Sequence, residues 1–286
     1  MHIPGSMLQN TLCTVTLAAA AASLVAAVHF ARKAKDRPTS LGFGALTALI
    51  FAAQMMNFPV MNGVSGHLLG GVLAAALLGI PFGVLSVALV ISVQALLLGD
   101  GGLDALGANI FNMAVLGAGV GGVLYQALHA RCSKPLAMAI ASWGAVMLAA
   151  LAVSLELGGT VAFLAVAPSM LGVHALVGIG EALIAVLTFE LLSSTAVTGG
   201  RHASGWVSSG LAAMLVLFSP FASALPDGLA WVVAQQGLAP AQAIAPLIHM
   251  GIPLEMTSMV GALVSFAAGW GMLRIMNRPL GKRMGS

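Results

Sequence analysis

Charged side chains are scarce in this 286-residue chain: Asp, Glu, Lys and Arg make up 7% of it, and hydrophobic residues make up 59%. A soluble domain carries about 25% charged residues. The scarcity therefore excludes an ordinary soluble fold. It predicts an all-α polytopic membrane protein, because helices satisfy their own backbone polar groups inside a bilayer.

Three further absences exclude whole classes of function. The sequence has no GxxxxGK[ST] loop, so this chain does not hydrolyse ATP by a P-loop. It has no basic stripe interleaved with aromatic residues, which argues against a nucleic-acid partner. Its two cysteines, Cys13 and Cys132, are far apart and lack a CxxC partner, so we expect neither a disulfide nor a cysteine metal site.

The first eleven residues contain no Lys or Arg, and a basic cluster, Arg32 to Arg37, follows the first apolar stretch. A signal peptide has the opposite order. We therefore expect the N-terminus to lie outside the cell and to be retained. We also expect Met1 to remain, because methionine removal normally requires a small second residue and His2 is large.

The apolar stretches predict nine spans, a seven-helix core followed by two C-terminal helices, with the C-terminus in the cytoplasm. The third and fourth could instead form one long helix, but a hairpin turning at 79–83 places every Lys and Arg on the cytoplasmic side. The third span is short, so we expect it to begin inside the protein. The predicted spans are roughly 8–31, 41–56, 67–79, 82–98, 107–130, 136–157, 168–193, 205–222 and 255–275.

A shift in composition at 198–202, Thr-Gly-Gly-Arg-His, suggests a linker. We therefore predict a core of residues 1–200 and an accessory segment of residues 201–286. The sizeable polar stretch of the accessory segment, 223–254, is expected outside the membrane.

One stretch, 54–71, is polar without being charged, although it lies between two apolar spans. A histidine at membrane depth is a candidate functional residue, and we expect His67 to begin a helix here. The neighbouring Asn57, Asn62 and Ser65 could orient a ligand histidine. They could equally satisfy the backbone of the loop.

The N-terminus is the second candidate. The Met1 amine, the His2 amide nitrogen and the Nδ1 atom of His2 can chelate one metal ion in fused rings, and planar nitrogen donors suit Ni(II) and Cu(II). His67 could supply a fourth nitrogen. The alternative interpretation is that His2 is a solvated terminal residue.

Two polar residues of the seventh span, His174 and Glu181, are seven positions apart and so lie on one helix face. We expect Glu181 to face the bundle and to have a partner, because a lone carboxylate in lipid is costly. The simpler interpretation is a structural hydrogen bond. The alternative is a supporting role at a metal site or along an ion path.

Another alternative comes from Gly63-Val64-Ser65-Gly66, which matches the GxSG of rhomboid intramembrane proteases. In that interpretation Ser65 is the nucleophile and His174 its base. A structural membrane protein without a metal site is the third possibility.

Four stretches together resemble the CbiM/NikM family: MHIP at the start, AAQMMNFPVMNGVSGHLLGG at 52–71, DGGLDALGANIFNMAVLG at 100–117 and HALVGIGEALI at 174–184. These proteins are the substrate-binding membrane subunits of energy-coupling-factor transporters for cobalt and nickel. LPDGLAWV at 225–232 resembles the small accessory subunit of the same systems, here fused to the C-terminus.

The resemblance implies a transporter subunit, not an enzyme, in a bacterial inner membrane. It implies Ni²⁺ or Co²⁺ as the cargo, with nickel favoured by the fusion, and a link to cobalamin biosynthesis. It also implies Met1, His2 and His67 as ligands, a transmembrane coupling subunit and two cytoplasmic ATPases as partners. The family reads MHIPDG, whereas Gly5-Ser6 follow MHIP here.

Overall fold

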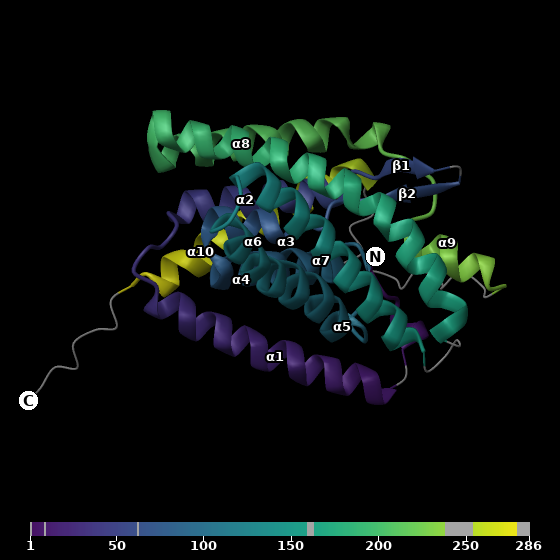
Figure 1. Ribbon diagram of the computed structural model, residues 1–286. Helices are drawn as coiled ribbons and strands as arrows, with labels where there is room; N and C mark the ends of the chain where they lie inside the picture. Colours follow the sequence, from purple (N-terminus) through teal and green to yellow (C-terminus); the bar gives the residue numbers. More distant parts are fainter. Residues whose placement is uncertain (1, 9, 62, 159–162, 238–253, 279–286) are drawn as a thin grey trace, which may run out of the picture.

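The structure, a computed structural model, describes residues 2–8, 10–61, 63–158, 163–237 and 254–278. Within these ranges seven helices are long and apolar enough to cross a membrane. They lie roughly alongside one another in one bundle (Figure 1). The prediction of an all-α polytopic membrane protein is confirmed.

The long helices follow the predicted spans closely, whereas α3 is shorter than the predicted span 67–79. The first half of the chain contains η1 (Gly5–Met7), α1 (Asn10–Lys33), α2 (Ser40–Gln54), β1 (Phe58–Met61), β2 (Val64–Gly66), α3 (Gly71–Leu78), α4 (Ile80–Leu97), α5 (Leu106–Ile110), the π-helical η2 (Phe111–Val120) and α6 (Gly121–His129). The second half contains α7 (Lys134–Leu157), α8 (Phe163–Phe218), η3 (Ser219–Phe221), α9 (Gly228–Gln235) and α10 (Leu254–Met276).

The two ends of the bundle differ in character, and we name them for what they carry. The hairpin end holds residues 2–8, the strands β1 and β2, and α9, on the right in Figure 1. The basic end holds the α1–α2 connection with Arg32 to Arg37 and the end of α10. Successive spans run between these ends.

The turn between α3 and α4 is the predicted hairpin. Gly79 ends α3 and precedes α4 with φ of 91°, a conformation that favours glycine. A Cβ atom on Gly83 would lie 2.6 Å from the backbone nitrogen of Ala75, so the two helices pack directly against each other. A single long helix is therefore excluded.

The segment 57–66, expected to be a loop, contains a short antiparallel hairpin in which Phe58 pairs with Gly66 and Pro59 with Ser65. The prediction that His67 begins a helix is wrong. Residues 67–70 have no regular secondary structure, and α3 begins at Gly71. Gly70 adopts φ of 72° immediately before the helix, which sets this later start.

Helix α8 reverses direction. Its 56 residues would span about 84 Å if straight. Yet Ala165 near its start accepts a hydrogen bond from Gln236 just after α9, and Ser223 just after its end donates to the Asn57 carbonyl, both at the hairpin end. Figure 1 shows α8 running to the basic end and returning. The backbone stays helical through 198–202, where the composition suggested a linker. The predicted spans 168–193 and 205–222 correspond to the candidate spans 163–196 and 203–221.

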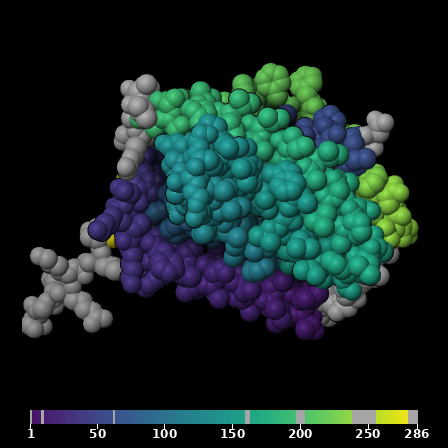
Figure 2. Space-filling view, in the orientation of Figure 1, coloured from purple at the N-terminus to yellow at the C-terminus, as the bar shows by residue number. Residues whose placement is uncertain are grey.

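The C-terminal helix α10 packs closely on α2. A Cβ atom on Gly44 would lie 2.8 Å from the Phe266 carbonyl oxygen, and one on Gly269 would lie 3.3 Å from the Cα atom of Gly44. Small residues allow such close approach in lipid. Helix α1 instead lies along an edge of the bundle, in purple in Figure 2, and exposes Val25 and Phe30.

Candidate metal site

The imidazole rings of His2 and His67 meet at the hairpin end. Their centroids are 5.7 Å apart and their planes differ by 23°. Both residues are buried, with exposed fractions of 9% and 7%. The fold thus brings the N-terminal segment and the segment after β2 together, although they are far apart in sequence.

The His2 ring is held through both of its nitrogens. Its Nε2 atom lies 3.1 Å from Oε1 of Gln94 on α4, and its Nδ1 atom lies 3.1 Å from Oδ2 of Asp100. Burial lowers the pKa of His2, although the Asp100 carboxylate acts in the opposite direction. A neutral ring has one proton for these two acceptors.

The backbone around His2 is fixed by a buried amide. Asn109 accepts a hydrogen bond from the Ile3 N–H at 2.8 Å and donates one to the Ile3 carbonyl at 3.1 Å. Gly5 then donates to the Gly101 carbonyl at 3.2 Å. A Cβ atom on Gly101 would lie 2.2 Å from the amide nitrogen of Asn109, so only glycine fits there.

Gly5 stands where the resemblance predicts an aspartate, and it lies close to Asp104. A Cβ atom on Gly5 would lie 2.8 Å from the Cβ atom of Asp104. The aspartate that the resemblance predicts at this position would therefore require a shift of the 100–105 loop.

The ring of His67 has one defined tautomer. Its Nδ1 atom lies 3.1 Å from the Leu68 carbonyl, which can only accept, so the proton belongs on Nδ1 and the lone pair on Nε2. Burial lowers the pKa of His67 to about 3, so the ring is neutral near pH 7. The Nε2 atom lies 4.0 Å from Oδ2 of Asp227.

The accessory segment reaches this site through residues 225–228. The Ser65 N–H donates to the Pro226 carbonyl at 2.9 Å, and the Ser65 hydroxyl donates to the Leu225 carbonyl at 2.7 Å. Asp227 caps α9 by accepting from the Ala230 N–H at 2.8 Å. Burial opposes ionisation of Asp227, but nearby positive charge and this N–H outweigh it and lower its pKa.

The other predicted residues have different places. The Nδ1 atom of His174 lies 2.8 Å from the Met170 carbonyl of its own helix, and its ring packs against Gly228. His174 also borders a cavity of about 10 Å³ that His67 and Asp227 line. The Asn57 carbonyl accepts from Ser223. Met1 and Asn62 lie outside the described residues.

The protease interpretation finds no support in these contacts. The Ser65 hydroxyl donates to the main chain of the accessory segment, and the His174 ring bonds to its own helix. A nucleophile and its base need a mutual hydrogen bond. The described residues show none between Ser65 and His174.

Sequence reasoning missed Gln94, Asp100, Asn109 and Asp227 as neighbours of the two histidines. Asp100 and Asn109 lie within the 100–117 stretch, and Asp227 lies within LPDG, but their partners are distant in sequence. Local patterns identify such residues as turn or helix residues. They do not show which segment the turn contacts.

Side chains alone do not complete a metal site here: among the described residues, no group of three or more His, Cys, Asp or Glu side chains converges. Two imidazoles are a partial donor set. Main-chain nitrogens next to His2 would have to supply the remainder.

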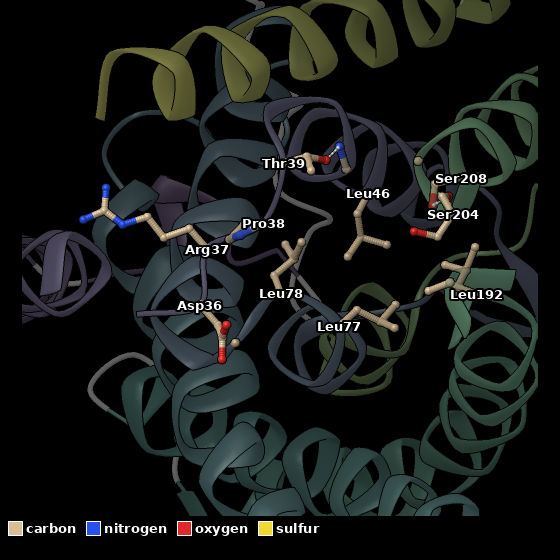
Figure 3. A pocket seen from close by; sticks show the side chains of 14 residues that line it. Asp36, Arg37, Pro38, Thr39, Leu46, Leu77, Leu78, Leu192, Ser204 and Ser208 are labelled. Carbon is tan, nitrogen blue, oxygen red and sulfur yellow. Dashed lines mark hydrogen bonds between the residues drawn. The ribbon is translucent and has the colours of Figure 1, made fainter. Parts of the chain in front are cut away.

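A separate cavity of about 360 Å³ lies at the basic end, lined by α2, α3, the two arms of α8 and the α1–α2 connection. Figure 3 shows Leu46, Leu77 and Leu192 inside it, with Asp36 and Arg37 toward one side. Its described lining includes no histidine or cysteine. This cavity is therefore no candidate for the metal.

Fold and site together define a class, a polytopic all-α membrane protein that buries two stacked imidazoles at one end of its bundle. The chain matches the family CbiM, "Cobalt uptake substrate-specific transmembrane region", over residues 2–198. The chain belongs to this family.

Individual relatives are also named as metal transport proteins. The "Putative fused nickel transport protein NikMN" of Archaeoglobus fulgidus is 36% identical over 226 residues, covering 77% of this chain and 75% of that protein. The "Cobalt transport protein CbiM" of Thermosediminibacter oceani is 30% identical over 219 residues, covering 72% and 89%. The crystal structure of a truncated transition metal transporter, 33% identical, has a TM-score of 0.62 and covers 68% of this chain and 99% of that chain.

The match to the fused relative spans more of the chain than residues 2–198 can account for. It therefore extends into the segment that follows the family region. This supports a fused protein in which an accessory segment follows a CbiM-type core.

Proposed function

We propose that this chain is the substrate-binding membrane subunit of an ATP-driven importer of nickel or cobalt ions. The cargo is bound by the Met1 amine, the His2 amide nitrogen, Nδ1 of His2 and Nε2 of His67. Nickel is favoured over cobalt because the relatives named as fused proteins, such as the NikMN of Archaeoglobus fulgidus, are named nickel transport proteins.

The observation that carries this proposal is the His2–His67 stack, with rings 5.7 Å apart. In the tautomer that a metal ion at Nδ1 requires, Nε2–H of His2 donates to Gln94, and Nδ1–H of His67 donates to Leu68. These contacts direct the lone pairs to Nδ1 of His2 and Nε2 of His67, the nitrogens that the proposed chelate requires. Such partners fix the tautomer of a ligand histidine.

The charges near the stack also suit a cation. A lone pair on His2 Nδ1 faces the Asp100 carboxylate at 3.1 Å, which is repulsive unless a proton or a cation lies there. Asp227 is the second carboxylate, beside His67. Together they offset the positive charge of a divalent cargo.

The test is metal content by mass spectrometry on the purified chain after exposure to nickel or cobalt. His67→Ala removes a donor, and we expect the affinity to fall by more than about 100-fold, because loss even of a supporting partner costs 10–100-fold. His29→Ala, which removes an exposed histidine of α1, is the matched control. Equal metal retention in all three proteins would refute the site, and retention in none would favour a structural protein without metal.

We further propose that the basic end faces the cytoplasm and the hairpin end faces outside. The arginines at the α1–α2 connection and at the end of α10 support this orientation through the positive-inside rule. The resemblance supports a transmembrane coupling subunit and two ATPases as partners, and the chain itself has no P-loop. Nickel uptake by cells that lack the coupling subunit would contradict this arrangement.

The accessory segment, residues 201–286, is proposed to gate loading of the metal from outside. Support comes from the contacts of Ser65 with residues 225–226 and from the position of Asp227 beside His67. A contact between residues 225–227 and the segment that carries His67 is what such gating would require. Residues 238–253 of the predicted outer stretch lie outside the described residues.

A further inference from the structure

The four residues 67–70 carry a candidate ligand yet belong to no helix or strand. Their backbone polar groups are buried and need partners from elsewhere. Glu181 of α8 supplies two of them: its carboxylate accepts from the Leu69 N–H at 2.6 Å and from the Gly70 N–H at 2.9 Å. Its exposed fraction is 1%.

Gln54, the last residue of α2, supplies another partner. Its Nε2 atom donates to the Leu69 carbonyl at 2.7 Å. Its own Oε1 atom is buried and has no hydrogen-bond partner among the described residues. The peptide group between Leu69 and Gly70 is thus held on both sides: α2 donates to its carbonyl and α8 accepts from its N–H. The segment that carries His67 therefore cannot rotate without breaking buried hydrogen bonds.

A carboxylate is an expensive way to hold a loop inside a membrane protein. It is also the one common side chain that accepts two N–H bonds without bringing a donor of its own. A glutamine of the same size would turn its NH₂ group toward one of the two N–H groups. The Glu181 carboxylate is therefore well suited to fix the backbone of residues 69 and 70.

Resting on the proposed function, we propose that Glu181 is a positioning residue that fixes the direction of the His67 ring and thereby sets which metal ions the site accepts. Gln54 supports the same peptide in the same role.

The geometry of the proposed site depends on its fourth donor, His67. The amine, the amide nitrogen and the imidazole of residues 1 and 2 belong to one short peptide and move together. The direction of His67 then decides between a planar set of four nitrogens, which suits Ni(II) and Cu(II), and the tetrahedral set that Zn(II) adopts. A fixed His67 disfavours zinc, whereas a loosened His67 tolerates it.

The test is competition between nickel and zinc at equal concentrations on the purified full chain, with both metals counted by mass spectrometry. We expect Glu181→Gln to lower the nickel-to-zinc ratio by about tenfold, the low end of the effect of losing a partner of a ligand histidine. Glu190→Gln, on the same helix at an exposed position, is the matched control and should leave the ratio unchanged.

A purely structural role would lower retention of both metals in proportion and leave the ratio unchanged. Gln54→Met, which keeps size but removes the donor to Leu69, provides a second variant should Glu181→Gln unfold. We expect its ratio to move in the same direction by a smaller factor. The electron paramagnetic resonance spectrum of bound Cu(II) should also depart from the wild-type spectrum in Glu181→Gln.

The outcomes separate the two proposals. Suppose that the wild type binds metal and His67→Ala does not, but that Glu181→Gln and Gln54→Met both keep the wild-type nickel-to-zinc ratio. The inference about Glu181 is then overturned, and the proposed site stands. If neither the wild type nor His67→Ala binds nickel, the proposed function itself fails.

Discussion

The two ends of the bundle both carry polar residues, but they use them differently. At the hairpin end the polar side chains are mostly buried and bond to segments far away in sequence, as Asn109 does to Ile3 and Glu181 does to Leu69. At the basic end they are mostly exposed and bond locally, as Arg131 does to Ala127. Arg37 is the exception, because it donates to the partly buried Met276 carbonyl at the end of α10 and to the exposed Asn277 side chain.

The difference teaches what each end is built for. Buried long-range hydrogen bonds fix the position of main chain and rings, which a small ion with directional ligands requires. Exposed cations contribute little to stability individually but set orientation in a membrane. Under the proposed function, metal recognition and membrane orientation would thus belong to opposite ends of the bundle.

We expect the largest difference between the two ends when one asparagine is replaced at each end. Asn109→Ala leaves the Ile3 N–H and carbonyl without their buried partner, which costs about 1–3 kcal/mol. We expect nickel affinity to fall by about 10–100-fold, measured by isothermal titration. Asn277→Ala removes an exposed contact with Arg37 and should have no measurable effect. Equal losses in both variants would contradict the contrast between the ends.

A smaller effect is expected from the carboxylate of the accessory segment. Asp227→Asn keeps an N-cap acceptor for α9 and removes only the charge. We expect the rate of nickel binding to fall by a few-fold to about tenfold, and more at low ionic strength, because salt screens the lost attraction. Asp36→Asn, at the rim of the basic-end cavity, is the control. A rate independent of Asp227 would argue against gating by the accessory segment.

The smallest effect concerns pH. The unfolded chain protonates His67 near pH 6.5, whereas in the folded protein its pKa is about 3. The unfolded state therefore binds the extra proton between these values, and stability should fall as pH falls from about 6.5 toward 3, by up to about 1.4 kcal/mol per pH unit. Thermal unfolding in detergent should show a shallower slope in His67→Gln than in the wild type or in the exposed-site variant His129→Gln. His2, whose pKa is also lowered, contributes to the slope that remains.

Much of the fold could be predicted from the sequence because lipid imposes simple rules. Apolar length located the spans, and the distribution of Lys and Arg selected the hairpin at Gly79. The same rules could not foresee the helical backbone through 198–202, where glycines suggest a linker. They also gave no signal for β1 and β2, which are only four and three residues long.

The candidate site was predictable in part for the same reason. His2 and His67 stand out as polar residues in apolar surroundings. Asp100 and Asp227 do not, because their importance depends on contacts with residues that are distant in sequence, and a local pattern holds no record of such contacts.

The central claim is that the N-terminal amine and His2 form one chelate with His67. The most direct test adds one residue before Met1, which keeps every side chain but moves the free amine out of the chelate, and measures nickel per chain by mass spectrometry. The account predicts about one nickel per chain in the wild type and none in the extended protein. Full retention by the extended protein would contradict the chelate.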